Sequence, residues 1–155
     1  MTAAQKGNII KILATGFGAG LSPVAPGTAG TLIGILMCLI CYPLDWPFRL
    51  LFVVAISALS IYVAGQAETL YGKTDDQRIV IDEIAGFQVA MLPVAITGLH
   101  LCLAFVLFRI FDIWKPFPLE HFQKFHGGWG VVADDLGAGV YAGLILFLFT
   151  LTGVI

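Results

Sequence analysis

Long apolar runs, separated by short polar stretches, dominate this 155-residue chain. Five runs stand out, at about 32–40, 48–64, two within 84–111, and 137–155. They hold few charges and show no strict alternation of apolar and polar positions, which is typical of helices in lipid. Several runs are shorter than the roughly 20 residues that a straight span requires. The pattern predicts an all-α, compact multi-helix integral membrane bundle with about five membrane-associated helices.

The stretch from Ile84 to Phe111 decides the topology, because its 28 residues exceed one comfortable span. Pro93 and Gly98 interrupt it, so we expect two helices joined by a tight turn near Gly98. Such a hairpin returns the chain to its starting side and places Asp82 and Asp112 on one face. A single span would place these two acids on opposite faces.

A short amphipathic segment precedes the runs. Residues Asn8 to Ala14 predict an additional interfacial helix at the membrane surface. We expect its lipid-facing side chains to be Ile9, Ile10, Ile12 and Leu13, with Lys6 and Lys11 at the surface.

Composition supports the membrane interpretation. Hydrophobic residues make up 59% of the chain and charged residues only 12%, against about 25% charged in a typical soluble domain. The length fits a single domain over residues 1–155. The net charge of −2 offers no basic surface, so we expect no nucleic-acid partner. Cys38, Cys41 and Cys102 lie inside apolar runs and are interpreted as small buried side chains.

The basic residues predict the orientation. If the hairpin forms, nearly all basic residues fall on one side of the membrane. They are Lys6, Lys11, Lys73, Arg78, Lys115 and Lys124, with Arg109 at the adjoining helix end. Only Arg49 falls on the other side. By the positive-inside rule, the side that holds most of the basic residues is cytoplasmic. We therefore predict a multi-pass protein of a cytoplasmic membrane.

Carboxylates occur at three places beside the apolar runs. We expect the pairs Asp82-Glu83 and Asp134-Asp135 each to open a helix, and Asp112 to lie at the end of another. Acids at a helix N-terminus can simply compensate the helix dipole. However, five carboxylates on one membrane face would repel one another unless a cation lies among them, and hard oxygen ligands favour Mg²⁺. We therefore predict a magnesium site.

Two further elements can contact phosphate. Arg109, Asp112 and Lys115 follow one another at i, i+3 and i+6, as in a salt-bridge ladder or as two phosphate-binding bases around a metal-ligating acid. The Gly-rich stretch 16–31 carries hydroxyls of Ser22, Thr28 and Thr31 just before an apolar helix, whose free N–H groups can bind phosphate. Thr28 also suits a plain N-cap, and this stretch alone favours a structural role.

Four motifs in order resemble the phosphatidylglycerophosphatase A family over about residues 16–143. They are Gly-Leu-Ser-Pro-Val-Ala-Pro-Gly-Thr-Ala-Gly-Thr at 20–31, Asp-Glu-Ile-Ala-Gly at 82–86, Phe-Arg-Ile-Phe-Asp-Ile-Trp-Lys-Pro-Phe-Pro at 108–118, and Gly-Gly-Trp-Gly-Val-Val-Ala-Asp-Asp-Leu-Gly-Ala-Gly at 127–139.

The resemblance implies an all-helical, Mg²⁺-dependent enzyme of the bacterial inner membrane. Its expected reaction is hydrolysis of phosphatidylglycerophosphate to phosphatidylglycerol and phosphate, the last step of phosphatidylglycerol synthesis. The implied catalytic residues are Asp82, Glu83, Arg109, Asp112, Lys115, Asp134 and Asp135. The implied metal ligands are the five acids among them, and the implied phosphate-binding residues are Ser22, Thr28, Thr31, Arg109 and Lys115.

We hypothesise a metal-assisted, in-line attack of water on the phosphomonoester. A covalent phosphoaspartate stays an alternative, whereas the Cys-x5-Arg signature of cysteine phosphatases does not occur. The alternative from another class is a small transporter or ion pathway lined by carboxylates. It requires acids at mid-bilayer depth, whereas here they gather at helix ends on one face. The sequence gives no oligomeric state.

Overall fold

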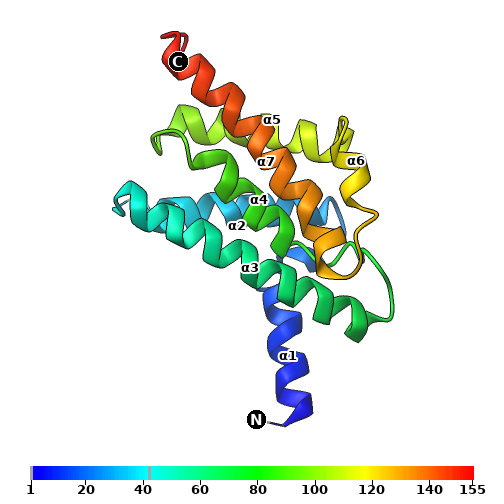
Figure 1. Ribbon diagram of the computed structural model, residues 1–155. Helices are drawn as coiled ribbons and strands as arrows, with labels where there is room; N and C mark the ends of the chain where they lie inside the picture. The colour runs from blue at the N-terminus through cyan, green and yellow to red at the C-terminus, as the bar shows by residue number, and fades with distance from the viewer. Residues whose placement is uncertain (1, 42) are drawn as a thin grey trace.

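The computed structural model describes residues 2–41 and 43–155 (Figure 1). Its elements are α1 (Ala3–Ala14), the 3₁₀ turn η1 (Ala19–Leu21), α2 (Pro26–Ile40), α3 (Trp46–Tyr71), α4 (Ile81–Met91), α5 (Gly98–Trp114), α6 (Leu119–Phe122) and α7 (Gly128–Leu151). No strand occurs within these described ranges, which confirms the all-α class.

The five apolar runs correspond to α2, α3, α4, α5 and α7, and most of these helices extend beyond the runs. The difference matters at α7, which begins at Gly128 rather than near residue 137. Asp134 and Asp135 therefore lie in its second turn, and its first turn holds no acid. The expectation that these acids open the last helix is wrong. Compensation of the helix dipole, which fades beyond the first turn, does not explain them.

Two of these helices, α3 with 26 residues and α7 with 24, are long and apolar enough to cross a membrane. The apolar helix α2 is shorter. Many large apolar side chains on these helices are exposed, among them Leu36, Leu51 and Leu148. An apolar exterior of this kind suits lipid rather than water and indicates a membrane protein.

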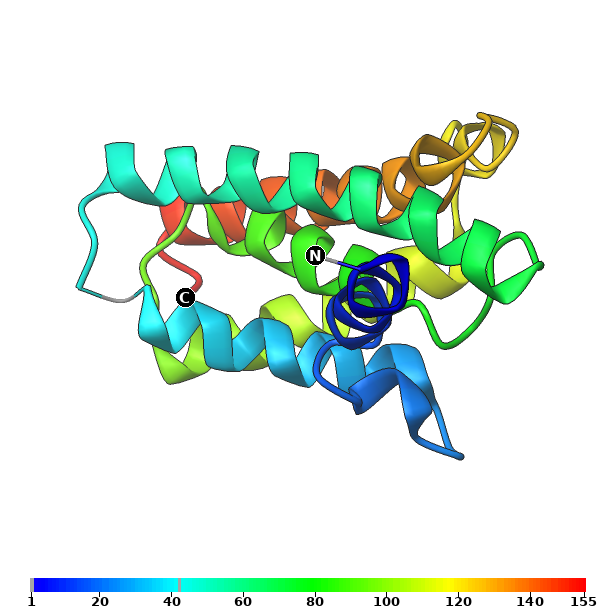
Figure 2. The same cartoon turned by 90° about the horizontal axis from the view of Figure 1, so that it is seen from below.

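The short helix α4 forms the centre of the bundle and packs against α2, α3, α5 and α7. Viewed from below, it lies between α3 and α7 on one side and α2 and α5 on the other (Figure 2). It has only 11 residues, or about 16 Å of helix, so it does not span a bilayer alone. Its nearly complete burial makes α4 the element that positions the acids at its start.

Glycines bring α4 and α7 into backbone contact. A Cβ atom on Gly86 would lie 2.6 Å from the Asp135 carbonyl oxygen, and one on Gly139 would overlap the Gly86 carbonyl. Only glycine permits so close an approach, as between membrane helices with small residues at their interface. This contact places Asp135 of α7 beside the first turn of α4.

The hairpin predicted within 84–111 is confirmed. Helix α4 ends at Met91, and α5 begins at Gly98 with Thr97 as its cap, whose hydroxyl accepts from the His100 N–H at 3.1 Å. The two helices pack against each other. The start of α4 and the end of α5 therefore lie at the same end of the molecule.

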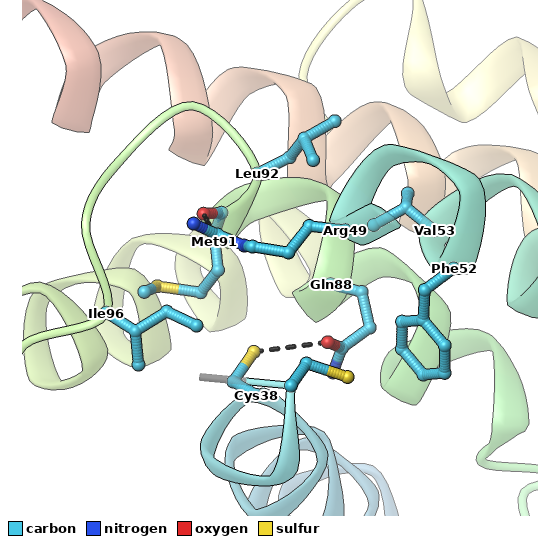
Figure 3. Close-up of a pocket in the computed structure, with 9 residues that line it drawn as sticks. Cys38, Arg49, Phe52, Val53, Gln88, Met91, Leu92 and Ile96 are labelled. Carbon is cyan, nitrogen blue, oxygen red and sulfur yellow. Dashed lines mark hydrogen bonds between the residues drawn. The ribbon is translucent and has the colours of Figure 1, made fainter. Parts of the chain in front are cut away.

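Arg49 holds the opposite end of α4 (Figure 3). Its Nη2 donates at 2.7 Å to the carbonyl oxygen of Met91, at the helix end where carbonyls lack intrahelical partners, and at 3.2 Å to that of Val94 in the following loop. Beside it, Gln88 Nε2 donates to the Gly34 carbonyl at 2.7 Å, and Cys38 Sγ lies 3.2 Å from Gln88 Oε1. These bonds join α2, α3 and α4 at the end remote from the acids.

Helix α1 runs across the direction of α3 and projects from the bundle (Figure 1), as a surface helix would. Ile9 and Ile12 are exposed, as expected for lipid-facing side chains, but Ile10 is 5% exposed and packs into the core. The expectation that Ile10 faces lipid is wrong. Of the three cysteines, Cys38 and Cys41 are buried as expected, whereas Cys102 is exposed.

Candidate active site

A polar pocket of about 320 Å³ opens where α2 begins, α4 begins and α5 ends. The second turn of α7 and the loop between α3 and α4 complete its wall. The pocket brings together six of the seven predicted catalytic residues: Asp82, Glu83, Arg109, Asp112, Lys115 and Asp135.

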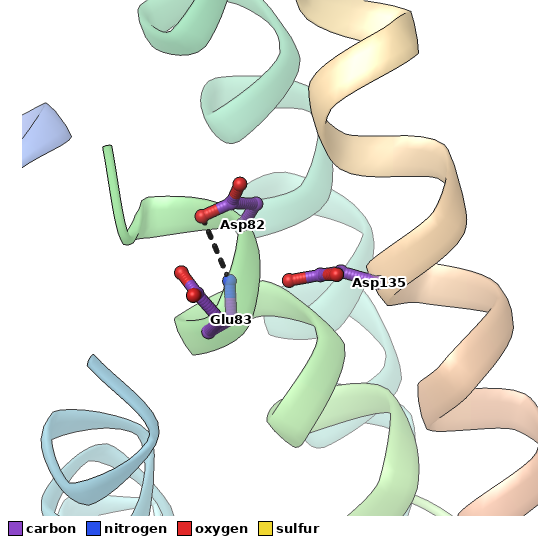
Figure 4. Close-up of side chains that lie close together, drawn as sticks. All are labelled: Asp82, Glu83 and Asp135. Carbon is purple, nitrogen blue, oxygen red and sulfur yellow. Dashed lines mark hydrogen bonds between the residues drawn. The ribbon is translucent and has the colours of Figure 1, made fainter. Parts of the chain in front are cut away.

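Three carboxylates form its centre (Figure 4). One oxygen from each of Asp82, Glu83 and Asp135 lies within 4.8 Å of the others. Asp82 and Asp135 are only 6% and 3% exposed. Asp82 Oδ1 accepts from the Glu83 N–H at 3.0 Å, while the buried Glu83 Oε2 has no hydrogen-bond partner. A buried group of negative oxygens with an unpaired member can accommodate a hard cation.

Arg109 lies next to this group and has N–H groups that make no hydrogen bond. Its Nη1 is 2.6 Å from Asp112 Oδ2 and 3.8 Å from Glu83 Oε1. Nevertheless, neither Nη1 nor Nε is aligned with an acceptor for a hydrogen bond, although both are buried. Since buried donors are normally paired, these N–H groups are suited to an anionic ligand in the pocket.

Asp134 and Lys115 form a separate pair. The Lys115 ammonium donates to Asp134 Oδ2, and Asp134 Oδ1 accepts from the Asp135 N–H at 3.1 Å. Lys115 caps α5 in the left-handed conformation, with φ of 45°. Asp134 does not line the pocket, whereas Lys115 does. The five predicted carboxylates are therefore divided. Asp82, Glu83 and Asp135 lie together, Asp112 pairs with Arg109, and Asp134 pairs with Lys115.

The start of α2 approaches the carboxylates directly. Ala25 is the N-cap, in the left-handed conformation with φ of 49°, and Pro26 occupies the first turn. The interpretation of Thr28 as the N-cap is therefore wrong. A Cβ on Gly27 would overlap Glu83 Oε1 and lie 2.9 Å from Arg109 Nη1. Gly27 is a site residue that the sequence analysis missed, because a close approach between segments leaves no local signal.

The three predicted phosphate-binding hydroxyls do not line this pocket. The Ser22 hydroxyl donates to the Val24 carbonyl at 2.8 Å, and that of the fully buried Thr31 donates to the Gly27 carbonyl at 2.9 Å. Thr28, partly buried, is not among the lining residues either. A phosphate role for Ser22, Thr28 and Thr31 stays a prediction.

The loop between α3 and α4 forms the mouth of the pocket through Asp75 and Gln77, which the sequence analysis also missed. Between them, Asp76 is buried and anchors the loop. Its Oδ1 and Oδ2 accept from Arg78 Nε at 2.7 Å and Nη2 at 3.0 Å. These hydrogen bonds hold the pKa of Asp76 below its usual value. The Arg78 guanidinium also stacks on Tyr71, 3.9 Å from the ring centre.

Comparison with known proteins identifies the family of this chain. The family described as phosphatidylglycerophosphatase A matches residues 12–150. A protein of Escherichia coli named "Phosphatidylglycerophosphatase A" is 37% identical over 140 residues, covering 88% of this chain and 81% of that protein. The protein of the same name from Haemophilus influenzae is 36% identical over 143 residues, covering 90% of this chain and 88% of its own.

A relative from Bacteroides thetaiotaomicron carries another name, "Putative phosphatidylinositol-3-phosphatase". It is 38% identical over 144 residues, covering 87% of this chain and 89% of that protein. No solved structure is significantly similar to this fold. The family match covers nearly the whole chain, including every element of the pocket, and favours an enzyme over a transporter. This chain belongs to the phosphatidylglycerophosphatase A family and is a phosphatase.

Proposed function

We propose that this chain hydrolyses phosphatidylglycerophosphate to phosphatidylglycerol and inorganic phosphate, using Mg²⁺ held by the carboxylate group. One observation carries the proposal. Three carboxylates with oxygens within 4.8 Å of one another share a pocket with Arg109, whose buried Nε and Nη1 lack aligned hydrogen-bond acceptors. Cation-binding oxygens beside anion-binding donors in one pocket match a phosphate monoester with its metal.

Asp82, Glu83 and Asp135 are the residues that would hold Mg²⁺. Their ligand atoms are all hard oxygens, the type that Mg²⁺ prefers, and the unpaired Glu83 Oε2 supplies a free ligand atom. Bound there, Mg²⁺ would neutralise negative charge on the phosphoryl oxygens during the transfer. Asp112 and Asp134 each pair with a base, and a ligand role for these two acids stays a prediction.

Arg109 and Lys115 bind the phosphate oxygens. The planar guanidinium of Arg109 donates two hydrogen bonds to a phosphate, and the Lys115 ammonium adds a second positive charge at the pocket edge. Asp112 holds Arg109 by its 2.6 Å ion pair, and Asp134 holds Lys115. The two acids thereby fix the positions of the two bases at the pocket.

The nucleophile is water in this scheme, and one carboxylate of the pocket accepts its proton. Water attacks phosphorus as the bond to the glycerol oxygen breaks, so phosphate leaves the lipid and the alkoxide takes up a proton.

We further propose a multi-pass arrangement in a bacterial inner membrane, with the pocket at the cytoplasmic face. The helices α3 and α7 are long and apolar enough to cross the bilayer, and the basic residues Arg109 and Lys115 line the pocket. Arg49 lies at the other end, where it caps α4. The phosphorylated headgroup then meets the pocket at the membrane surface, while the lipid tails stay in the bilayer.

The test is a comparison of substrates. Purified protein in mixed micelles receives phosphatidylglycerophosphate, phosphatidylinositol 3-phosphate or phosphatidate, and released phosphate is measured. We expect kcat/KM for phosphatidylglycerophosphate to exceed the others by at least about tenfold. The name of the Bacteroides relative indicates the inositol lipid as the substrate of that protein. A preference of this chain for the inositol lipid would contradict the proposed substrate but not the phosphatase activity.

A further inference from the structure

A second hollow lies between α2 and α5, beside the polar pocket. It has a volume of about 490 Å³ and is lined by Leu32 and Ile35 of α2 and by Leu101, Cys102, Phe105 and Val106 of α5. No charged side chain lines it among the described residues. Leu32 and Val106 are 50% and 52% exposed, so the hollow opens sideways to the surroundings of the helices. We call it the α2–α5 groove.

The groove continues from the pocket along the same two helices. α2 starts and α5 ends at the polar pocket, where Gly27 approaches Arg109. Ile35 lies eight residues after Gly27, and Leu101 lies eight residues before Arg109. At 1.5 Å per residue, both steps amount to about 12 Å. The groove therefore extends away from the phosphate-binding end by nearly one leaflet, roughly half of a hydrocarbon core of about 30 Å.

The helices leave this seam open. In the view from below, α2 and α5 lie side by side on one face of the bundle (Figure 2). They contact each other far less than either contacts α4, and the residues that line the groove all belong to α2 and α5. The result is a polar pocket at one end and an apolar channel at the other, which matches the division of a phospholipid into headgroup and tail.

We propose that one acyl chain of the lipid substrate lies in the α2–α5 groove while its phosphate occupies the polar pocket. This inference rests on the proposed lipid phosphatase activity and adds the tail-binding site to it. A chain held there orients the headgroup toward Arg109 and the carboxylates, so that binding of the tail positions the phosphate. The substrate enters sideways from the bilayer between α2 and α5.

The proposal is tested by the enzyme kinetics of a variant whose bulky side chain fills the groove. Cys102 is exposed in the groove, so Cys102→Trp adds bulk without disturbing the core. Val54→Trp, on the exposed side of α3, is the matched control. Each is assayed on long-chain phosphatidylglycerophosphate in mixed micelles and on its water-soluble, deacylated headgroup. We expect Cys102→Trp to lower kcat/KM by at least about tenfold on the lipid only, and Val54→Trp to change neither.

Labelling of the native cysteine gives a second measurement without a variant. Cys102 is exposed while Cys38 and Cys41 are buried, so a maleimide reports on the groove. Long-chain lipid substrate in EDTA should slow the labelling of Cys102 several-fold, and the deacylated headgroup should not. The acyl-chain site is contradicted if the lipid and the deacylated headgroup leave the same labelling rate of Cys102, or if Cys102→Trp has the wild-type kcat/KM on the lipid. Neither result would contradict the phosphatase activity. No phosphate release by the wild type from either substrate would overturn the proposed function itself.

Discussion

The carboxylate of Asp134 accepts a hydrogen bond from the Lys115 ammonium, whereas Asp135, the next residue, faces Asp82 and Glu83. Two adjacent acids thus serve different partners. We expect Asp135→Asn to weaken Mg²⁺ binding by about 10- to 100-fold, because it removes a proposed ligand oxygen. Asp134→Asn should lower kcat without changing the Mg²⁺ concentration for half-maximal rate, because it loosens Lys115.

Magnesium titrations of phosphate release by the two variants check this difference. The conservative variant Lys115→Arg keeps the positive charge and should retain more activity than Lys115→Met. If Asp134→Asn and Asp135→Asn shift the Mg²⁺ dependence equally, the division of roles is wrong.

Gly27 should tolerate no side chain. Gly27→Ala places a methyl group against Glu83 Oε1 and Arg109 Nη1, so one of these must move. We expect kcat/KM to fall by about 100-fold, since small displacements in an active site are costly. Gly7→Ala is the control, because a Cβ there meets only Leu70 at an ordinary 3.7 Å. Equal activity of the two variants would show that the α2 start is not part of the site.

Arg49 should contribute stability without affecting catalysis. Arg49→Ala removes both hydrogen bonds to the Met91 and Val94 carbonyls, and we expect a loss of about 2 kcal/mol in unfolding free energy. Thermal unfolding in detergent measures the loss, while the Mg²⁺ dependence of the remaining activity should match wild type. A change in Mg²⁺ dependence with unaltered unfolding would contradict the assignment of Arg49 as a cap of α4.

The Asp76–Arg78 pair predicts a pH dependence of stability. The pKa of Asp76 is lowered in the folded chain, so its contribution is present above the ordinary Asp pKa of about 3.9 and is lost as pH falls through the lower folded value. Asp76→Asn should therefore melt below wild type near neutral pH. The difference should shrink between about pH 5 and pH 3. A difference that stays constant over this range would contradict the pairing.

The helices were largely predictable because their apolar runs are long and the break near Pro93 and Gly98 is explicit in the sequence. The acids of the pocket were predictable because charges are rare beside such runs. Their grouping was not, since Asp134 and Asp135 are indistinguishable by type and only the rotation of α7 separates them. The place of Gly27 in the site was not predictable for a related reason, because the residues that it approaches, Glu83 and Arg109, are distant in sequence.

The central claim is that Asp82, Glu83 and Asp135 hold the Mg²⁺ that hydrolysis requires. The most direct measurement is phosphate release from phosphatidylglycerophosphate by purified wild type, Asp82→Asn and Asp135→Asn over a range of Mg²⁺ concentrations. Asp45→Asn, an exposed acid at the opposite end, is the control. We predict no wild-type activity in EDTA, full recovery with Mg²⁺, and at least about 100-fold lower rates for the two site variants. Wild-type activity in EDTA, or near-normal rates for both site variants, would contradict the account.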